Sequence, residues 1–370
     1  DLFALVLDLI PPVLVAETID PFATTGDPFG MDLDVTDNFG VKRVEVEHWQ
    51  GTSPGHAWVN MTLVSGTEEA GTWNVTLLAR SDTLEDLNLR VHAWDLADNK
   101  MDVISYVRSV RDNDPPAFVE DHSPDSAETD MSYTFNVSVE DNIGLQDVWI
   151  EYWYGDGNRT GATMELRGST WEAVIIVGDT LDDLHYYLWC RDTSDNRNST
   201  SVRTVPVIDI NGPQIVNEGT GRTATTGDPF EFTLTAWDNV GLKGATLWYA
   251  YGDDELVPVD MMVEEAGPSG NVLYSLIIDV RSDFVGNITY RIGLEDLYGN
   301  NFTTFDKYVR VVDDDPPMVL DEDISPSATT GDPFSYRLTV TDNIGIASVQ
   351  LDYFFSDDPP NATISTEAMV

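Results

Sequence analysis

One ordered set of motifs occurs four times along this 370-residue chain. Its last copy, Val311 to Gly345, holds an acidic linker, a proline pair, a turn, an alternating strand and an Asp-Asn-x-Gly loop. That loop begins at four positions, which lie 104, 97 and 104 residues apart: Asp37, Asp141, Asp238 and Asp342. A period near one hundred residues is the length of a small domain, whereas solenoid repeats are shorter. The sequence therefore predicts a tandem array of small domains.

The repeats set the expected domain boundaries. We expect the last strand and linker of a preceding domain at 1–12, domain 1 at 13–114, domain 2 at 115–212, domain 3 at 213–315 and the first half of domain 4 at 316–370. The apolar start has acidic residues, a proline pair and no basic leader, so it is not typical of a signal peptide or membrane anchor. Both ends are interpreted as cuts through a longer array; alternatively, Leu2–Leu7 completes domain 4 of a neighbouring subunit by strand addition.

Short segments within each repeat alternate apolar and polar residues, and none keeps a helical period. Seven such segments occur in domain 2: Phe118–Val119, Met131–Val139, Val148–Tyr154, Ala162–Leu166, Thr170–Val177, His185–Cys190 and Ser201–Ile208. Seven short strands in about one hundred residues are the pattern of an immunoglobulin-like sandwich. The predicted fold class is therefore all-β, with tandem seven-stranded immunoglobulin-like β-sandwich domains.

The alternation also predicts which side chains form the core. Inward positions of the second strand are apolar in domains 1 and 3: Phe29, Met31, Leu33, Val35, Phe230, Phe232 and Leu234. Trp73 and Trp171 are interpreted as core anchors. Other aromatics, among them Trp153 and Trp248, fall on the opposite face. For these outward rings, packing on the strand face or between domains is one interpretation, and a sugar-binding platform is the other.

The charge balance narrows the classes of partner. Acidic residues number 65 against 19 basic ones, which gives a net charge of −46. A phosphate backbone would be repelled, so no nucleic-acid partner is expected, whereas cations would be attracted. The small number of lysines, together with the many acidic residues, resembles the composition of proteins from salty surroundings. The alternative interpretation is an ordinary solvated acidic surface with no special habitat. The single Cys190 excludes an intrachain disulfide, and the five scattered histidines give no zinc, haem or iron–sulfur pattern.

Acidic and amide residues recur at three places in each repeat: the linker, the loop after the second strand and the loop after the sixth strand. In an immunoglobulin-like sandwich those two loops lie at one end, where the chain also enters. Ca²⁺ takes about six to eight oxygen ligands, so we expect calcium sites at these entrances. The candidate ligands are Asp112, Asp114, Asp141, Asn142, Asp192, Asp195, Asp209, Asn211, Asp238, Asp296, Asp313, Asp315, Asp342 and Asn343.

The competing interpretation is that Asp, Asn and Gly form turns and bind nothing. Recurrence of all three acidic groups at one predicted end favours calcium over that alternative. The first linker has Leu9 and Ile10 where later linkers have acidic or amide residues, so the weakest site is expected there.

The linker Asp112-Asn113-Asp114-Pro115 resembles the acidic interdomain linker of cadherins. Over essentially its whole length, the chain is similar to the immunoglobulin-like and cadherin-like modules of bacterial and archaeal surface proteins. That resemblance implies tandem domains stiffened by calcium. The Asp-Arg-Glu type of tripeptide found in true cadherins is missing from the sequence, so homophilic adhesion is not implied.

Sequons for N-glycosylation are more frequent than expected. Twenty asparagines would give roughly three sequons by chance, whereas eight occur. This excess indicates an extracellular, glycosylated surface; incidental sequons in threonine-rich strands are the alternative. The acceptor residues are Asn60, Asn74, Asn136, Asn158, Asn198, Asn287, Asn301 and Asn361.

These observations favour a structural role over catalysis. The sequence shows no nucleophile elbow, phosphate loop or His-centred triad, and its carboxylate groups recur in every repeat, whereas an active site would occur once. We predict a non-enzymatic extracellular array that self-associates into a surface layer, sheath or filament, with Ca²⁺ at its junctions and no membrane contact in this segment. The alternative is an adhesin stalk or carbohydrate-binding region of a larger surface protein, with cell-surface glycans as partners.

Overall fold

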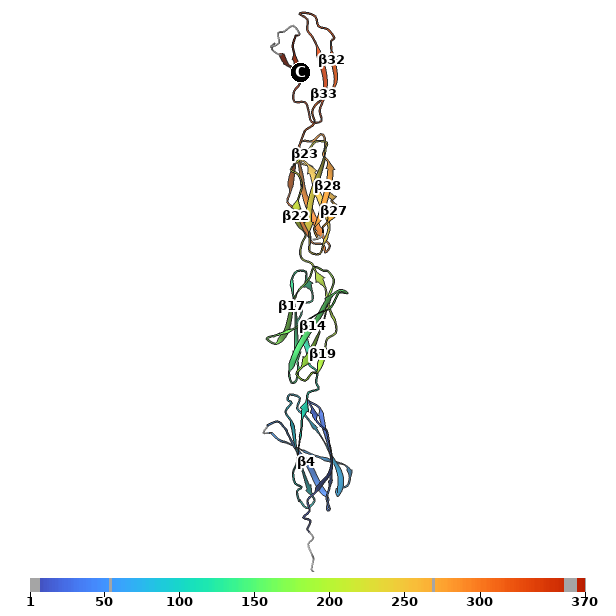
Figure 1. The fold of residues 1–370 in the computed structure, drawn as a ribbon, viewed down its shortest axis with the longest axis vertical. Coiled ribbons are helices and arrows are strands. Elements are labelled where there is room, and N and C mark those ends of the chain that lie inside the picture. The colour runs from blue at the N-terminus through green and yellow to red at the C-terminus, as the bar shows by residue number, and fades with distance from the viewer. Residues whose placement is uncertain (1–6, 53–54, 268–269, 356–364, 370) are drawn as a thin grey trace, which may run out of the picture. The chain divides into compact units, whose positions relative to one another are not determined.

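The computed structural model describes residues 7–52, 55–267, 270–355 and 365–369, and every regular element within them is a β-strand (Figure 1). The chain separates into two compact units, residues 1–178 with 182–207 and residues 179–181 with 208–370. The predicted all-β class is confirmed. The predicted first strand, Leu2–Leu7, lies outside the described residues except for Leu7, which is in no strand.

The described residues of domain 1 form ten strands: β1 (Val13–Ile19), β2 (Ala23–Thr24), β3 (Pro28–Thr36), β4 (Val41–Gln50), β5 (Ala57–Asn60), β6 (Thr62–Gly66), β7 (Ala70–Leu78), β8 (Leu87–Asp95), β9 (Ile104–Arg108) and β10 (Val110–Arg111). One sheet has the order β1-β3-β7-β6, and the facing sheet has the order β5-β4-β8-β9. Strand β2 pairs in parallel with β10.

Domain 2 repeats this arrangement with eleven strands: β11 (Ala117–Asp121), β12 (Ala127–Glu128), β13 (Ser132–Glu140), β14 (Leu145–Tyr154), β15 (Thr160–Thr163), β16 (Glu165–Arg167), β17 (Thr170–Ile176), β18 (Leu184–Asp192), β19 (Arg197–Ser199), β20 (Arg203–Val205) and β21 (Val207–Ile208). Its sheets run β11-β13-β17-β16 and β15-β14-β18-β19, with β20 on β18 and β12 on β21.

In domain 3 the part that the structure describes has ten strands: β22 (Gln214–Glu218), β23 (Thr223–Thr225), β24 (Pro229–Trp237), β25 (Leu242–Tyr251), β26 (Val257–Asp260), β27 (Met262–Ala266), β28 (Val272–Asp279), β29 (Gly286–Asp296), β30 (Asn301–Thr303) and β31 (Lys307–Val312). Its sheets run β22-β24-β28-β27 and β23-β31-β29-β25-β26, with β30 on β29. After residue 316 the described chain forms the pairs β32 (Met318–Ile324) with β33 (Tyr336–Thr341) and β34 (Gln350–Tyr353) with β35 (Ser365–Ala368).

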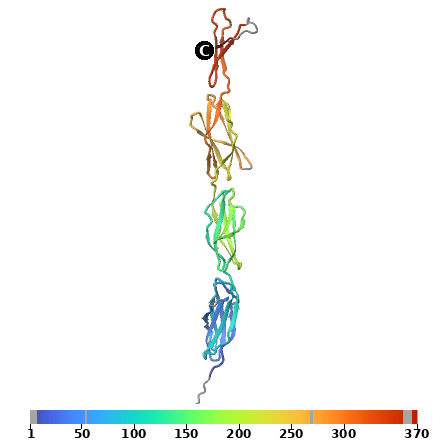
Figure 2. The ribbon, with the colours of Figure 1, turned by 90° about the vertical axis from the view of Figure 1, so that its left-hand side faces the viewer.

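Two packed sheets with these strand orders are an immunoglobulin-like sandwich, as predicted (Figure 2). The inward faces of β3, β13 and β24 contribute to the cores of domains 1, 2 and 3. In domain 1, Phe29, Met31, Leu33 and Val35 are all buried, with polar or small residues between them. Each of the three complete domains has its own cluster of buried apolar side chains. The cores therefore follow directly from the period-two alternation.

One predicted strand of domain 2, Ala162–Leu166, is two strands in the structure. Strand β15 belongs to one sheet and β16 to the other, and Met164 lies buried between them. Its N–H donates to Val148 O at 2.9 Å, and Met61 and Met261 make the same bond in domains 1 and 3. An unbranched thioether side chain fits the irregular space between two sheets. The predicted last strand, Ser201–Ile208, is likewise divided at Pro206 into β20 and β21.

In each sandwich a tyrosine hydroxyl of one sheet donates a hydrogen bond to an acidic side chain of the other sheet. In domain 2 the Tyr186 hydroxyl donates to Asp121 Oδ2 at 2.7 Å, and Arg203 Nη1 lies 3.0 Å from the same oxygen. Burial by itself would raise the pKa of the Asp121 carboxyl, but hydrogen bonds from Ser123, Tyr186 and Arg203 outweigh it and hold that pKa below its usual value. The ionised form of Asp121 therefore stabilises domain 2.

The variant Asp121→Asn should lower the free energy of unfolding of domain 2 by about 1–2 kcal/mol at pH 7, because it removes a charged hydrogen-bond acceptor. The contribution of Asp121 is complete above its unfolded-state pKa of about 3.9 and is lost as the pH falls through the lower folded-state pKa. Urea unfolding at several pH values measures this. Asp125→Asn is the matched control, since Asp125 also pairs with Arg203 but is fully exposed. Equal effects of the two substitutions would contradict the prediction.

Candidate functional site

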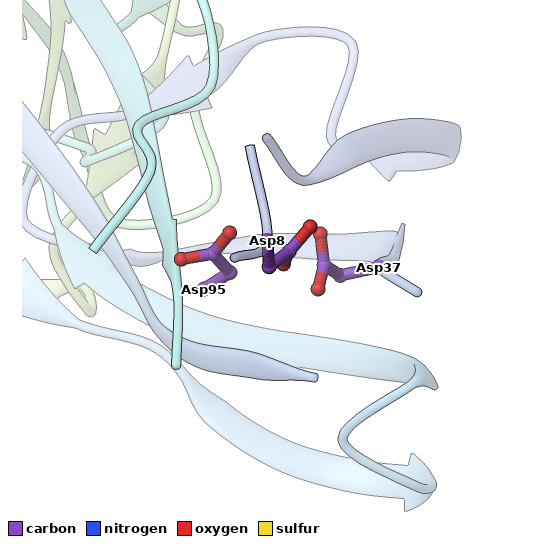
Figure 3. Close-up of side chains that lie close together, drawn as sticks. All are labelled: Asp8, Asp37 and Asp95. Carbon is purple, nitrogen blue, oxygen red and sulfur yellow. The ribbon is translucent and has the colours of Figure 1, made fainter. Parts of the chain in front are cut away.

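Three aspartates converge at the entrance of each complete domain. The groups are Asp8, Asp37 and Asp95; Asp112, Asp141 and Asp192; and Asp209, Asp238 and Asp296. In each group one carboxylate oxygen of every member lies within 4.8 Å of the others. Figure 3 shows the first group, in which the side chains of Asp8, Asp37 and Asp95 lie together.

The sandwich topology brings these residues together. In domain 2, Asp112 belongs to the linker before β11, Asp141 follows β13 and Asp192 ends β18. The loops after β13 and β18 emerge at the same end of the sandwich, next to the incoming linker. The same three positions supply the groups of domains 1 and 3, so each group forms wherever the fold forms.

Backbone N–H groups hold the middle aspartate of each group by one oxygen. Asp141 Oδ1 accepts hydrogen bonds from the N–H groups of Ile143 at 2.9 Å and Gly144 at 2.6 Å, and Asp37 and Asp238 are held in the same way. This is the local turn that an Asp-Asn-x-Gly sequence favours. The second oxygen, Oδ2, is buried without a hydrogen-bond partner at all three residues. Asp37 and Asp238 are only 7% and 3% exposed.

The third aspartate is fully buried in each group. Asp296 Oδ1 accepts three backbone N–H groups, from Tyr298, Gly299 and Asn300, at 2.6–2.9 Å. Its Oδ2 is buried and lacks a hydrogen-bond partner. In domain 2, Asp192 Oδ2 accepts the side-chain amide of Asn196 at 2.8 Å. One oxygen of this aspartate thus anchors the loop, and in domain 3 the other is left unpaired.

In domain 2 the linker aspartate, Asp112, joins the group to domain 1. Asp112 Oδ1 accepts the Thr25 hydroxyl of domain 1 at 3.0 Å and Asn142 Nδ2 of domain 2 at 3.3 Å. Its Oδ2 is buried and unpaired, and so is Asp8 Oδ2. Asn142 Nδ2 also donates to Ser81 O of domain 1 at 2.8 Å. The entrance of domain 2 is therefore connected to both domains.

The electrostatics of these groups favour the binding of a cation. Two carboxylates at this separation repel by roughly 3 kcal/mol at an effective dielectric constant of about 20. Burial raises the pKa of the Asp238 carboxyl, and the neighbouring charges of Asp296 and Asp209 act in the same direction, while backbone N–H groups oppose them. Several unpaired carboxylate oxygens with no nitrogen or sulfur ligand are the donor set of a hard cation such as Ca²⁺ or Mg²⁺. The residues present therefore fit the calcium expected from the sequence.

Six of the candidate ligands lie within these groups: Asp112, Asp141, Asp192, Asp209, Asp238 and Asp296. Asp195 does not, because its exposed carboxylate pairs with Arg191 at 3.2 Å. Asp114 Oδ2 instead accepts the Thr25 hydroxyl at 2.8 Å and Asn142 Nδ2 at 3.2 Å. Asn142 thus presents a nitrogen to the two linker carboxylates, and only its Oδ1 could be a ligand.

The remaining candidates take supporting positions. Asn211 donates its N–H to Asp209 Oδ1, and its carbonyl oxygen accepts Asn300 Nδ2. At the entrance of domain 4, Asn343 Nδ2 donates to Asp313 at 3.1 Å and to Asp315 at 3.2 Å, while Asp342 Oδ1 accepts two backbone N–H groups. The hydrogen bond from Asn343 lowers the pKa of Asp313. Among the described residues, no third carboxylate completes this entrance.

Sequence reasoning missed Asp8, Asp37 and Asp95 as a group. A signal was present, because Asp8 precedes Asp37 by 29 residues, just as Asp112 precedes Asp141. The expectation of a weak first site gave weight to Leu9 and Ile10, but both side chains are exposed and lie outside the group. The position of an aspartate in the linker, 29 residues before the middle aspartate, decides whether its side chain reaches the other two carboxylates. The charge of the residues beside it in the linker does not.

The structure also places seven of the eight sequon asparagines. Exposed residues are Asn60, Asn158, Asn198, Asn287 and Asn301, and partly buried residues are Asn74 and Asn136. The eighth, Asn361, lies outside the described residues. Asn74 and Asn136 donate their side-chain amides to Asp32 and Glu172 on neighbouring strands. The five exposed asparagines are therefore more accessible to glycosylation than Asn74 and Asn136.

Comparison with known proteins gives structural similarity only. The sequence matches no family model and no curated protein. The chain is similar to the titin I-band fragment I67–I69, with 14% identity over 83% of this chain and 100% of that one, at a TM-score of 0.45. It is also similar to the ICAM-5 D1–D4 ectodomain fragment, with 12% identity over 95% and 98% at 0.39, and to extracellular domains 3–5 of Drosophila OTK, with 12% identity over 80% and 94% at 0.26.

The strand orders themselves define the class: a tandem array of immunoglobulin-like sandwiches. Each complete sandwich carries an acidic group at its entrance. No helix in the described part of the chain is long and apolar enough to cross a membrane.

The variant Asp141→Asn should separate the two roles of this carboxylate. The amide oxygen can still accept the N–H groups of Ile143 and Gly144, while the amide nitrogen replaces the unpaired Oδ2. Without divalent cations the variant should therefore be at least as stable as the parent, because repulsion is relieved. With millimolar Ca²⁺ it should lose the rise in melting temperature that the parent shows. Asp195→Asn, in which an exposed acid of the adjacent loop is changed, should retain that rise.

Differential scanning calorimetry with calcium and with a chelator measures both predictions. If Asp141→Asn gained as much from calcium as Asp195→Asn does, Asp141 would not be a ligand.

Proposed function

We propose that this chain is part of a non-enzymatic, extracellular structural array whose domain junctions are stiffened by bound calcium. The observation that carries the proposal is the entrance group, which repeats in each complete domain and joins the linker to two loops through carboxylates with unpaired buried oxygens. A calcium ion bound there would fix the linker against the sandwich that follows it.

Stiffening follows from where the ligands are attached. Asp112 lies in the linker, and its neighbours Thr25 and Asn142 belong to domains 1 and 2. A similar connection occurs at the entrance of domain 4, where Asn343 Nδ2 donates to Ser282 O of domain 3 at 2.9 Å. A cation that holds the linker carboxylate therefore restricts rotation of one domain on the next, because both domains contact the same few atoms.

Further observations support an extracellular, non-catalytic role. The acidic groups recur with the domains, whereas a catalytic site would be expected once. Most of the sequon asparagines described are exposed, which is consistent with glycosylation outside the cell. The net charge of −46 suits a salty exterior, where ions screen repulsion between neighbouring domains and chains. A surface layer, a sheath and a filament, as in archaeal cell envelopes, are all arrays of this kind.

The junction between domains 1 and 2 offers a direct test of stiffening. Spin labels on Val64→Cys in β6 and Glu165→Cys in β16 would report the distance between the two domains by pulsed electron paramagnetic resonance; Cys190 is buried and should stay unlabelled. Calcium should narrow the distance distribution, and a chelator should broaden it. Adding Asp141→Asn should leave the distribution broad in calcium, and adding Asp195→Asn should not. A distribution that calcium does not change would contradict the proposal.

Assembly is tested on the native material. Electron microscopy of the protein purified from its source should show ordered fibres or sheets that loosen when calcium is chelated. Dispersed rods that do not respond to chelation would instead favour the second candidate function, an adhesin stalk or carbohydrate-binding region. That candidate is favoured by one observation, the outward aromatic side chains on the β14–β18 and β25–β29 sheets.

A further inference from the structure

The outer face of one sheet is filled differently in each domain. In domain 2, Trp149 and Trp189 are cross-strand partners on β14 and β18, and their rings stack with centroids 3.9 Å apart. In domain 1 the corresponding His92 on β8 lies 4.7 Å from the ring of Trp58 and 5.9 Å from that of Trp94. Rings thus cover this face in both domains.

In domain 3 the corresponding cross-strand pair is Thr246 and Gly293, so this position carries no ring. The side chain of Trp248 lies over Gly293 instead: a Cβ atom at Gly293 would come within 2.5 Å of Trp248 Cζ3. Among the described residues, no other ring stacks on Trp248. Domain 3 therefore has one partly exposed indole where domains 1 and 2 have packed aromatic groups.

A groove of about 520 Å³ lies beside this indole. Its lining includes the ion pair of Lys243 with Glu295, at 2.7 Å, and the hydrogen bond from Thr246 to Asp260, at 3.1 Å. A volume of roughly 300–1,000 Å³ is typical of ligand pockets. An apolar ring face flanked by charged and hydroxyl groups matches a sugar, whose C–H face packs on an indole while its hydroxyls form hydrogen bonds.

The same groove is lined by a glycosylation sequon. Asn301 and Thr303 on β30 both line it, and the whole sequon Asn301-Phe302-Thr303 is exposed. Asn301 Nδ2 donates one hydrogen bond, to Gly299 O at 2.8 Å. An amide nitrogen has two N–H donors, so a sugar can replace one hydrogen while the other keeps this bond. A glycan on Asn301 would thus start within the groove without disturbing β30.

We infer that the sugar linked to Asn301 folds back into this groove and packs against Trp248. In the transfer step, Asn301 Nδ2 bonds to the anomeric carbon of a sugar carried on a lipid diphosphate, loses one proton, and the lipid diphosphate leaves. The attached sugar then covers the face that aromatic side chains cover in domains 1 and 2. This inference rests on the glycosylated, extracellular character proposed above.

Hydroxyl-radical footprinting read by mass spectrometry tests the inference on the full chain expressed in an N-glycosylating host. Glycopeptide mapping first gives the occupancy of each sequon. Oxidation of Trp248 should then be several-fold lower in the glycosylated chain than in Asn301→Gln, while oxidation of the exposed Trp58 stays the same. Asn287→Gln is the matched control, because it removes the other sequon of domain 3 and should leave Trp248 protected.

Three results would overturn the inference. If glycans were found at other sequons but not at Asn301, the proposed sugar would not exist, while the proposal of a glycosylated surface would stand. Equal oxidation of Trp248 with and without the Asn301 glycan would show that the sugar points to solvent. A chain without sugar at any sequon would reject the glycosylated surface itself, and the inference with it.

Discussion

Repulsion among the carboxylates at the domain entrances is the physical constraint on which the proposed calcium sites depend. Backbone N–H groups hold Asp141 and Asp296 by one oxygen each, and this fixes the charges in place instead of letting them separate. Their other oxygens stay buried and unpaired. The loops of this fold thus place several carboxylate oxygens together. This donor set is the basis for proposing a divalent cation, which binds several oxygen ligands at once.

At the entrance of domain 2 this constraint also involves the preceding domain, because the linker between domains 1 and 2 supplies one of the carboxylates. Asp112 contacts Thr25 in the domain before it and Asn142 in the domain after it. In the proposed role, ion binding, loop order and the orientation of domains 1 and 2 would be coupled through these few shared atoms. Under the proposed role, cations from the medium would act in two ways: they would bind the carboxylates at the entrances, and they would screen the net charge of −46.

Sequence reasoning succeeded where the signal is local and periodic. Alternation placed Phe29, Met31, Leu33 and Val35 in the core, and the Asp-Asn-x-Gly motif placed the turn at Asp141. It failed where a residue's partner depends on the path of the chain between sheets. The break at Met164 is an example, because it depends on which of the two sheets each half of the segment joins. Asp195 was a different failure: it is exposed and pairs with Arg191, only four residues earlier, so a local contact was overlooked.

The sequence by itself determined the repeat, the all-β class and the supply of oxygen ligands, because these follow from periodicity and residue type. Only the tertiary structure decided which carboxylates meet. It brought Asp8 together with Asp37 and Asp95, although Leu9 and Ile10 lie beside Asp8. It also left Trp248 over Gly293 as a single indole in a groove that Asn301 lines as well. The physical reason is that strand register and loop path, and not distance along the chain, set the distances between side chains.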